Sequence, residues 1–96
     1  MADYRLSEAA DRDISEIARY TLETWGEAQT DRYRLGMQRA FERISRNPKL
    51  GISSENIRPG TFRYRYQRHV VFYKPTREGI LIIRVLHTQM DYIRHL

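Results

Sequence analysis

The feature that most constrains this chain is an apolar run near its carboxyl end, residues 80–86, which is interrupted by a single Arg at position 84. A short, continuous apolar run predicts a central strand of a sheet. Because a charge among apolar neighbours is costly unless it is paired, Arg84 requires a partner, either Asp91 or a bound chain. The strand closes on His87, and a short tail follows that ends on Arg94, His95 and Leu96.

The length and composition allow one small domain, residues 1–96, and exclude an enclosed cofactor site of ordinary size. The absence of cysteine excludes disulfides and thiolate chemistry. His69, His87 and His95 lack zinc-site spacing, and no phosphate loop or dinucleotide glycine pattern is present, so neither a metal nor a cofactor is expected. No segment from Met1 onward has the roughly 20 apolar residues of a membrane helix, which predicts a soluble, unexported, cytoplasmic protein.

The net charge of +5 is concentrated in the second half of the chain. Residues 1–48 hold 8 Arg and 9 acids, whereas residues 49–96 hold 9 Arg or Lys and 3 acids. Fifteen of the 17 basic residues are Arg, which favours planar, bidentate contacts with carboxylates or phosphates. An ordinary solvated surface explains the charge equally well. The two partners that fit the alternative are nucleic acid and an acidic polypeptide.

The first half of the chain predicts a strand and a helical hairpin. Residues 3–6 form a short strand, and Ser7 caps a helix whose apolar stripe continues to Trp25. Gly26 ends that helix. A second helix, residues 27–46, carries its own apolar stripe and stops at Asn47 and Pro48. Because the connection is so short, the two helices must be antiparallel neighbours.

The second half predicts an antiparallel meander. Residues 50–59 are expected to be loop, and the strands that follow are residues 62–66, 69–74 and 80–86, with a tight turn near Gln67 and Arg68. Short connections make these strands antiparallel. The fold class is therefore α+β, in the order β-α-α-β-β-β, with the helical hairpin packed on one face of a small, mostly antiparallel sheet.

Strict alternation assigns side chains to the two faces of this sheet. Arg63 and Arg65 share the face opposite the aromatic stripe Phe62, Tyr64 and Tyr66, and that stripe is more often core than a base-stacking platform. In the last strand, the residues with odd numbers share one face, and Ile80, Ile82, Arg84 and Leu86 share the other. The hairpin covers one face through Ile17, Leu22, Phe41 and Ile44. Arg63, Arg65 and Arg84 are expected on the open face.

Several segments of the chain carry a resemblance to a known family. They are residues 4–10, 47–51, 58–60 and 68–73, the Trp25-Gly26 pair, and the ending that combines residues 84–87, Met90-Asp91 and residues 94–96. In these segments the chain resembles the ParE toxins of bacterial toxin-antitoxin systems, within the RelE/ParE superfamily. The resemblance implies a type II toxin, associated with plasmid stabilisation, that inhibits DNA gyrase and is neutralised by a ParD-like antitoxin with an acidic carboxyl-terminal segment.

The residues expected to bind the target are those of the last strand and tail: Arg84, His87, Met90, Asp91, Tyr92, Arg94, His95 and Leu96. The residues expected to bind the antitoxin in a hetero-oligomer come from the hairpin stripe and the basic strand: Ile17, Leu22, Trp25, Tyr33, Met37, Phe41, Arg63 and Arg65. Within the tail, Met90, Ile93 and Leu96 recur at intervals of three and predict an apolar edge. Deleting residues 92–96 is expected to abolish inhibition without unfolding the protein, unless Ile93 and Leu96 plug the core.

Two alternatives remain open. The first is a RelE-like, ribosome-dependent messenger RNA endoribonuclease that uses Arg63, Arg65, Arg84, His87 and Tyr92 as base, acid and phosphate-binding groups. The carboxylate of Asp91 argues against it, because it would repel the scissile phosphate, and His87 is more often structural than catalytic at such a position. The second alternative is an inactive chain that only binds an antitoxin.

Overall fold

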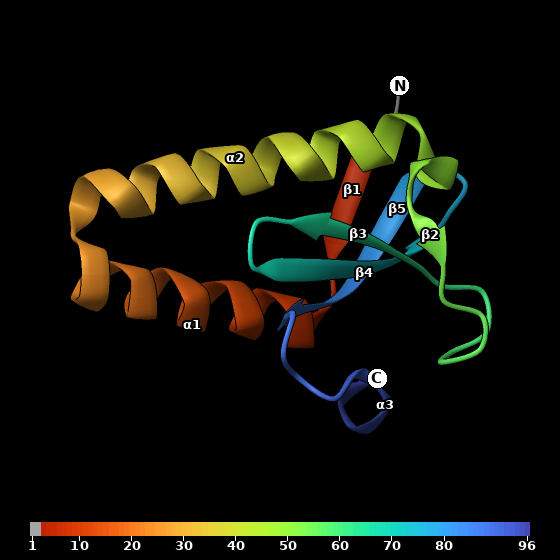
Figure 1. The fold of residues 1–96 in the computed structure, drawn as a ribbon. Coiled ribbons are helices and arrows are strands. Elements are labelled where there is room, and N and C mark those ends of the chain that lie inside the picture. Colours follow the sequence, from red (N-terminus) through yellow and green to blue (C-terminus); the bar gives the residue numbers. More distant parts are fainter. Residues whose placement is uncertain (1–2) are drawn as a thin grey trace.

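The computed structural model describes residues 3–96, so the expectation for Met1 and Ala2 lies outside the described residues. The sheet packs against a long helical hairpin on one face (Figure 1). The elements are β1 (Asp3–Leu6), α1 (Glu8–Trp25), α2 (Glu27–Arg46), η1 (Pro48–Leu50), β2 (Ile52–Ser53), β3 (Phe62–Tyr66), β4 (His69–Pro75), β5 (Gly79–His87) and α3 (Tyr92–His95). The predicted α+β fold class is confirmed. Within the described part of the chain, no helix combines the length and apolarity that crossing a membrane requires.

The hairpin forms as its sequence signals predict. The Ser7 hydroxyl accepts a hydrogen bond from the Ala10 amide at 3.0 Å and thereby caps α1. Gly26 has φ of +87°, a left-handed conformation that glycine adopts without strain, and it separates the two helices. The helices therefore run antiparallel from a single-residue connection (Figure 1), and apolar residues of both contribute to the same core cluster.

The sheet has the strand order β1-β5-β4-β3-β2. β1 runs parallel to β5, and the other neighbours are antiparallel. The β3–β4 turn places Gln67 at φ of +56°. β5 is thus an inner strand, paired with β4 along its length and with β1 over its first half, as its apolar composition predicts.

The segment expected to be loop contains two short elements, η1 and the edge strand β2. The loop prediction for residues 50–59 is therefore wrong at its start. Two contacts hold this part: the Tyr73 hydroxyl donates to the Pro48 carbonyl at 2.7 Å and accepts from the Gly51 amide at 2.9 Å. Because β2 has only two residues, no alternation pattern was available in the sequence to reveal it.

The alternation assigned to β5 is wrong in its first half because the strand contains a bulge. Phe72 pairs with Arg84, but the next β4 residue, Tyr73, pairs with Ile82, so Ile83 is the extra residue. As a result Ile80, Ile82 and Val85 all face the hairpin. The Ser7 hydroxyl donates to the Ile83 carbonyl at 2.6 Å and satisfies part of the irregular backbone.

The core has two parts, one on each face of the sheet. The main cluster lies beneath the hairpin and includes Phe41, Ile44, Tyr73 and Ile82, with the stripe of β3 packed against it. Leu22, expected in this core, is instead 48% exposed. The smaller cluster lies on the opposite face, where Tyr92 and Leu96 of the tail pack on a set of buried strand residues, Val70, Phe72 and Leu86. The open face predicted for the sheet is therefore partly closed by the tail.

Candidate partner-binding groove

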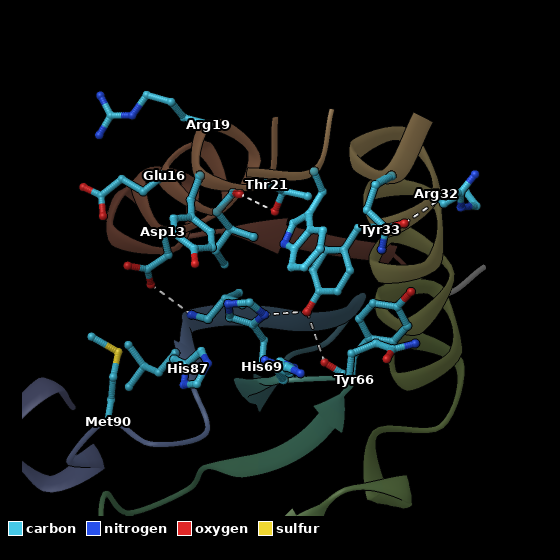
Figure 2. A pocket seen from close by; sticks show the side chains of 18 residues that line it. Asp13, Glu16, Arg19, Thr21, Arg32, Tyr33, Tyr66, His69, His87 and Met90 are labelled. Atoms are coloured by element: carbon cyan, nitrogen blue, oxygen red, sulfur yellow. Dashed lines mark hydrogen bonds between the residues drawn. The ribbon is translucent and has the colours of Figure 1, made fainter. Parts of the chain in front are cut away.

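An open groove of about 950 Å³ lies between the hairpin and the end of the sheet where β3 turns into β4 and β5 ends (Figure 2). Its walls come from α1 and from the first turns of α2, and its floor comes from the β3–β4 turn and the last residues of β5. Its aromatic, imidazole and thioether lining residues are Tyr20, Trp25, Tyr33, Tyr66, His69, His87 and Met90. Its charged lining residues are Asp13, Glu16, Arg19, Arg32 and Arg68.

The floor of the groove is a cluster of packed rings, of which Tyr33 and His69 are joined by a hydrogen bond. The Tyr33 hydroxyl is hydrogen-bonded to Nδ1 of His69, and it also makes a long hydrogen bond of 3.5 Å to the Tyr66 carbonyl (Figure 2). The His69 ring meets the His87 ring edge to face, with centroids 5.5 Å apart. These side chains come from α2, β3, β4 and β5, so the cluster ties the second helix to the end of the sheet.

The groove floor favours uncharged side chains. Burial, with the neighbouring Tyr66, raises the pKa of Tyr33 to about 12. Burial, with the neighbouring His87, lowers the pKa of His69 to about 4. At neutral pH the pair is therefore a phenol and a neutral imidazole, and it presents polar groups to the groove without a charge.

The groove carries exposed aromatic side chains on its walls and an excess of positive charge over its whole lining. Trp25 is 68% exposed and Tyr20 is 67% exposed, although both are large apolar groups. Three Arg residues face two acids, and Asp13 is already engaged with Arg84. An aromatic groove with an arginine excess suits an amphipathic segment that brings apolar anchors and carboxylates.

Arg84 finds its partner in α1. The Asp13 carboxylate accepts hydrogen bonds from Arg84 Nε at 2.8 Å and from its Nη2 at 2.9 Å, and from the Val85 amide at 2.9 Å. The prediction that Asp91 pairs with Arg84 is wrong, because the Asp91 carboxylate instead caps α3 by accepting from the Ile93 amide at 3.1 Å. The hydrogen bond to Asp13 raises the pKa of Arg84 above its ordinary value.

The tail docks on the face opposite the groove. The Tyr92 ring meets Phe72 edge to face at 5.0 Å, and its hydroxyl donates to the Thr88 carbonyl at 3.1 Å. Arg84 Nη1 donates to the His95 carbonyl at 2.8 Å and holds the end of α3. Met90 and Ile93 are 41% and 76% exposed, so the apolar edge predicted at intervals of three does not form. The docked pair is Tyr92 and Leu96, one helical turn apart.

The residues expected to bind an antitoxin separate into three groups. Ile17, Trp25 and Tyr33 line the groove. Leu22 is exposed on α1 but is not a groove residue, and Met37 and Phe41, each 4% exposed, belong to the main core. Arg63 and Arg65 lie on the opposite face of the sheet, since they pair with Phe72 and Val70 of the smaller cluster.

The residues expected to bind a target, and those of an endoribonuclease, also divide between the faces. His87 and Met90 line the groove. Asp91, Tyr92, Arg94, His95 and Leu96 belong to the tail, and Arg84 of β5 contacts the tail by donating to the His95 carbonyl. Four of the five endoribonuclease candidates share the face that is turned away from the hairpin: Arg63, Arg65 and Arg84 pair in register with residues of the smaller cluster, and Tyr92 packs on Phe72. His87 faces the hairpin side and is separated from them by the sheet. No cluster of three or more potential metal ligands occurs in residues 3–96.

Several groove residues were not singled out from the sequence. No sequence pattern predicted a site role for Asp13, and His69 entered only as one of three histidines without zinc-site spacing. Tyr20 and Arg68 were not predicted to be site residues. For His69, one signal was available, since a His that opens a strand opposite a strand-ending His is placed beside it in an antiparallel pair.

Comparisons with known proteins agree on one family. Residues 4–92 match the family model described as the ParE toxin of the type II toxin-antitoxin system, parDE. The chain is 38% identical over 94 residues to Toxin ParE1 of Mycobacterium tuberculosis, covering 97% of this chain and 96% of that protein. It is 38% identical over 96 residues to Toxin ParE1 of Caulobacter vibrioides, covering 100% of this chain and 99% of that protein.

The fold also has a solved counterpart. A chain of the chromosomal ParDE toxin-antitoxin system from P. aeruginosa superposes with a TM-score of 0.74 at 12% sequence identity. The match covers 91% of this chain and 96% of that chain. At 12% identity this comparison supports the fold alone. The matches to the family model and to the two ParE1 toxins show the family.

Proposed function

The chain belongs to the ParE toxins of type II toxin-antitoxin systems, and we propose that it inhibits DNA gyrase and is neutralised by a ParD-like antitoxin held in the groove. Membership of the family implies an antitoxin partner. The observation that supports the groove as its site is the exposure of Trp25 and Tyr20 beside three arginines. Inhibition of gyrase would place the action of the toxin in the cytoplasm, as a plasmid-stabilising or chromosomal system.

The antitoxin segment is expected to be acidic and amphipathic. Its apolar side chains would cover Trp25 and Tyr20, and its carboxylates would meet Arg19, Arg32 and Arg68. An uncharged floor at Tyr33 and His69 lets apolar groups approach without desolvating an ion. Opposite charges on the two partners should raise the association rate and make it sensitive to salt.

Trp25 offers a direct test of this site because it is the only tryptophan of the chain. Titration with the antitoxin encoded by the adjacent reading frame should shift the Trp25 emission to shorter wavelength as the ring leaves water. The antitoxin used must lack tryptophan. The variant Trp25→Ala should weaken binding at least tenfold, as a buried aromatic anchor would.

Leu35→Ala is the matched control for the Trp25 variant. Leu35 is 48% exposed on α2 and does not line the groove, so its removal should leave the affinity unchanged. Equal losses in the two variants, or an unshifted emission in the complex, would place the antitoxin elsewhere. An association rate that is indifferent to salt would contradict the electrostatic part of the proposal.

The tail is the proposed contact with gyrase. Its outward side chains are Ile93, Arg94 and His95, while Tyr92 and Leu96 anchor it on the sheet. His87 and Met90 lie on the groove side, so an antitoxin in the groove would cover these two proposed target contacts directly. Neutralisation would then combine overlap at His87 and Met90 with steric exclusion of gyrase from the neighbouring tail.

A gyrase supercoiling assay run beside a ribosomal messenger RNA cleavage assay tests the target. We expect inhibition in the first and no cuts in the second. Codon-dependent cleavage would overturn the proposal in favour of an endoribonuclease. Binding to the antitoxin with no effect in either assay would identify an inactive member of the family.

A further inference from the structure

Strand β3 carries two arginines, Arg63 and Arg65, that do not line the groove and have no role in it. Arg63 and Arg65 lie on the face of the sheet that is turned away from the hairpin, because their β4 partners Phe72 and Val70 belong to the smaller cluster. Among residues 3–96 the pair formed by Arg84 and Asp13 is the one salt bridge, so both arginines of β3 lack a carboxylate partner there.

Neutral acceptors orient these two arginines. Arg63 Nη1 donates to the Ser54 hydroxyl at 3.0 Å and to the Ser53 carbonyl at 3.4 Å. Arg65 Nε donates to the Gln67 carbonyl at 2.8 Å. Arg63 therefore keeps its Nη2 and Nε donors, and Arg65 keeps both terminal nitrogens. Two guanidinium groups with fixed stems and spare donors are prepared to hold oxygens of an anion.

The same face of the sheet carries two further cations, on strands β1 and β4. Lys74 and Arg5 both pair in register with Leu81 and are both exposed. The one acid of these strands on this face is Asp3, whose Oδ1 accepts from the Tyr4 amide at 2.8 Å. Besides Arg84, which is paired with Asp13, these strands place four cations and one acid on this face, in agreement with the charge excess of the second half of the chain.

We propose that this face, defined by Arg5, Arg63, Arg65 and Lys74, binds the phosphate backbone of duplex DNA. Arg63 and Arg65 are two residues apart on one strand, so their stems are separated by about 7 Å and can reach separate phosphates. The contacts would be to phosphates alone and therefore independent of base sequence.

The apolar content of the face favours nucleic acid over an acidic polypeptide. Its strand residues Val70, Phe72 and Leu86 are covered by Tyr92 and Leu96, which leaves Ile52 at the sheet edge as the exposed apolar residue of its strands, and Ile93 is exposed on the tail beside them. An acidic polypeptide depends on apolar anchors for much of its affinity, and the groove offers those instead. Phosphate contacts by Arg and Lys bind nucleic acid without such anchors.

This inference goes beyond gyrase inhibition and does not depend on it. Fluorescence anisotropy of a labelled 20-base-pair duplex of arbitrary sequence, titrated with the full chain over a salt series, tests it. The duplex should bind at low salt, and a second duplex of unrelated sequence should bind equally well. The double variant R63Q/R65Q should weaken binding at least tenfold and reduce the log–log salt slope by about 2.

The double variant R39Q/R46Q is the matched control. It removes the same charge from exposed positions of α2 that lie outside the groove and outside this face, so its salt slope should stay near that of the wild-type chain. No binding by the wild-type chain at low salt, or equal weakening by the two pairs, would overturn the proposal. Stronger binding of polyglutamate that R63Q/R65Q abolishes would reassign the face to an acidic polypeptide.

Discussion

The Asp13 carboxylate joins α1 to β5 by accepting three hydrogen bonds, two from the Arg84 guanidinium and one from the Val85 amide. Both side chains are largely shielded, with 12% of Asp13 and 22% of Arg84 exposed. β1 pairs with β5 only as far as Ile82, so Asp13 supplies an acceptor where the neighbouring strand has ended. One carboxylate therefore neutralises the charge within β5 and caps the uncovered edge of that strand.

The first prediction follows from this contact. Asp13→Asn should lower the free energy of unfolding by about 1 to 3 kcal/mol, because it leaves the Arg84 charge without its counterion and weakens the bond to Val85. Urea unfolding followed by circular dichroism measures the loss. Glu23→Gln removes an equal charge from an exposed position of α1 and should change the stability by less than about 0.5 kcal/mol. A matching loss in Glu23→Gln would show that total charge, not this contact, governs stability.

The contact also shows what could be predicted from the sequence. Arg84 was expected to need a partner because a charge in an apolar strand is costly, and that expectation is met. The identity of the partner was wrong because Asp13 is 71 residues away, and only the packing of α1 against β5 brings the two together. Local rules state that a charge must be paired, whereas the choice among acids depends on tertiary geometry.

The helices and the longer strands could be predicted because their signals in the sequence are local. Ser7, Gly26 and Pro48 act on their immediate neighbours, and the apolar stripes repeat over many residues. The bulge at Ile83 has no such local signal, since residues 80–83 are all apolar and fit either alternation of faces. The groove was only partly predicted, because its lining residues come from five separate elements.

The second prediction concerns the Tyr73 hydroxyl, which fixes the chain between α2 and β2. The side chain is fully buried, and its hydroxyl bonds both Pro48 and Gly51. Tyr73→Phe should lower the free energy of unfolding by about 1 to 2 kcal/mol, since it leaves two backbone groups without a partner. Tyr20→Phe is the control, because Tyr20 is 67% exposed and should tolerate the change. Unchanged stability in Tyr73→Phe would mean that water replaces the lost hydroxyl.

The third prediction concerns pH. The pKa of His69 is about 4 in the folded protein, against about 6.5 in an unfolded chain. Between these values the unfolded state binds more protons, so His69 contributes stability above pH 6.5 that is lost as the pH falls toward 4. Allowing for partial solvent exposure, the loss attributable to His69 should be about 1 to 2 kcal/mol.

Urea unfolding of the wild-type chain and of His69→Asn at pH 7 and pH 4.5 measures this contribution. The variant cannot titrate at this position, so its stability should decline less over the same interval, whatever its stability at pH 7. His95→Asn is the control, because His95 is exposed in α3. Parallel declines in the wild-type chain and His69→Asn would mean that His69 is protonated as easily in the fold as in the unfolded chain.

The fourth prediction revises the expectation for the tail. Deletion of residues 92–96 was expected to spare the fold because the core elements end near Leu86, but the tail covers the second core cluster. Phe72 and Leu86 are at most 1% exposed, and removal of the ring of Tyr92 would open that cluster to water. Tyr92→Ala should therefore lower the free energy of unfolding by about 1 to 3 kcal/mol.

Ile93→Ala in the same helix separates stability from target binding. Ile93 is 76% exposed, so its truncation should leave the melting temperature unchanged. If the outward side of the tail contacts gyrase, Ile93→Ala should reduce inhibition in the supercoiling assay while antitoxin binding persists. Full inhibition by Ile93→Ala and by Arg94→Ala, each with an unchanged melting temperature, would remove the outward side of α3 from the target site and leave its role as a cover for Phe72.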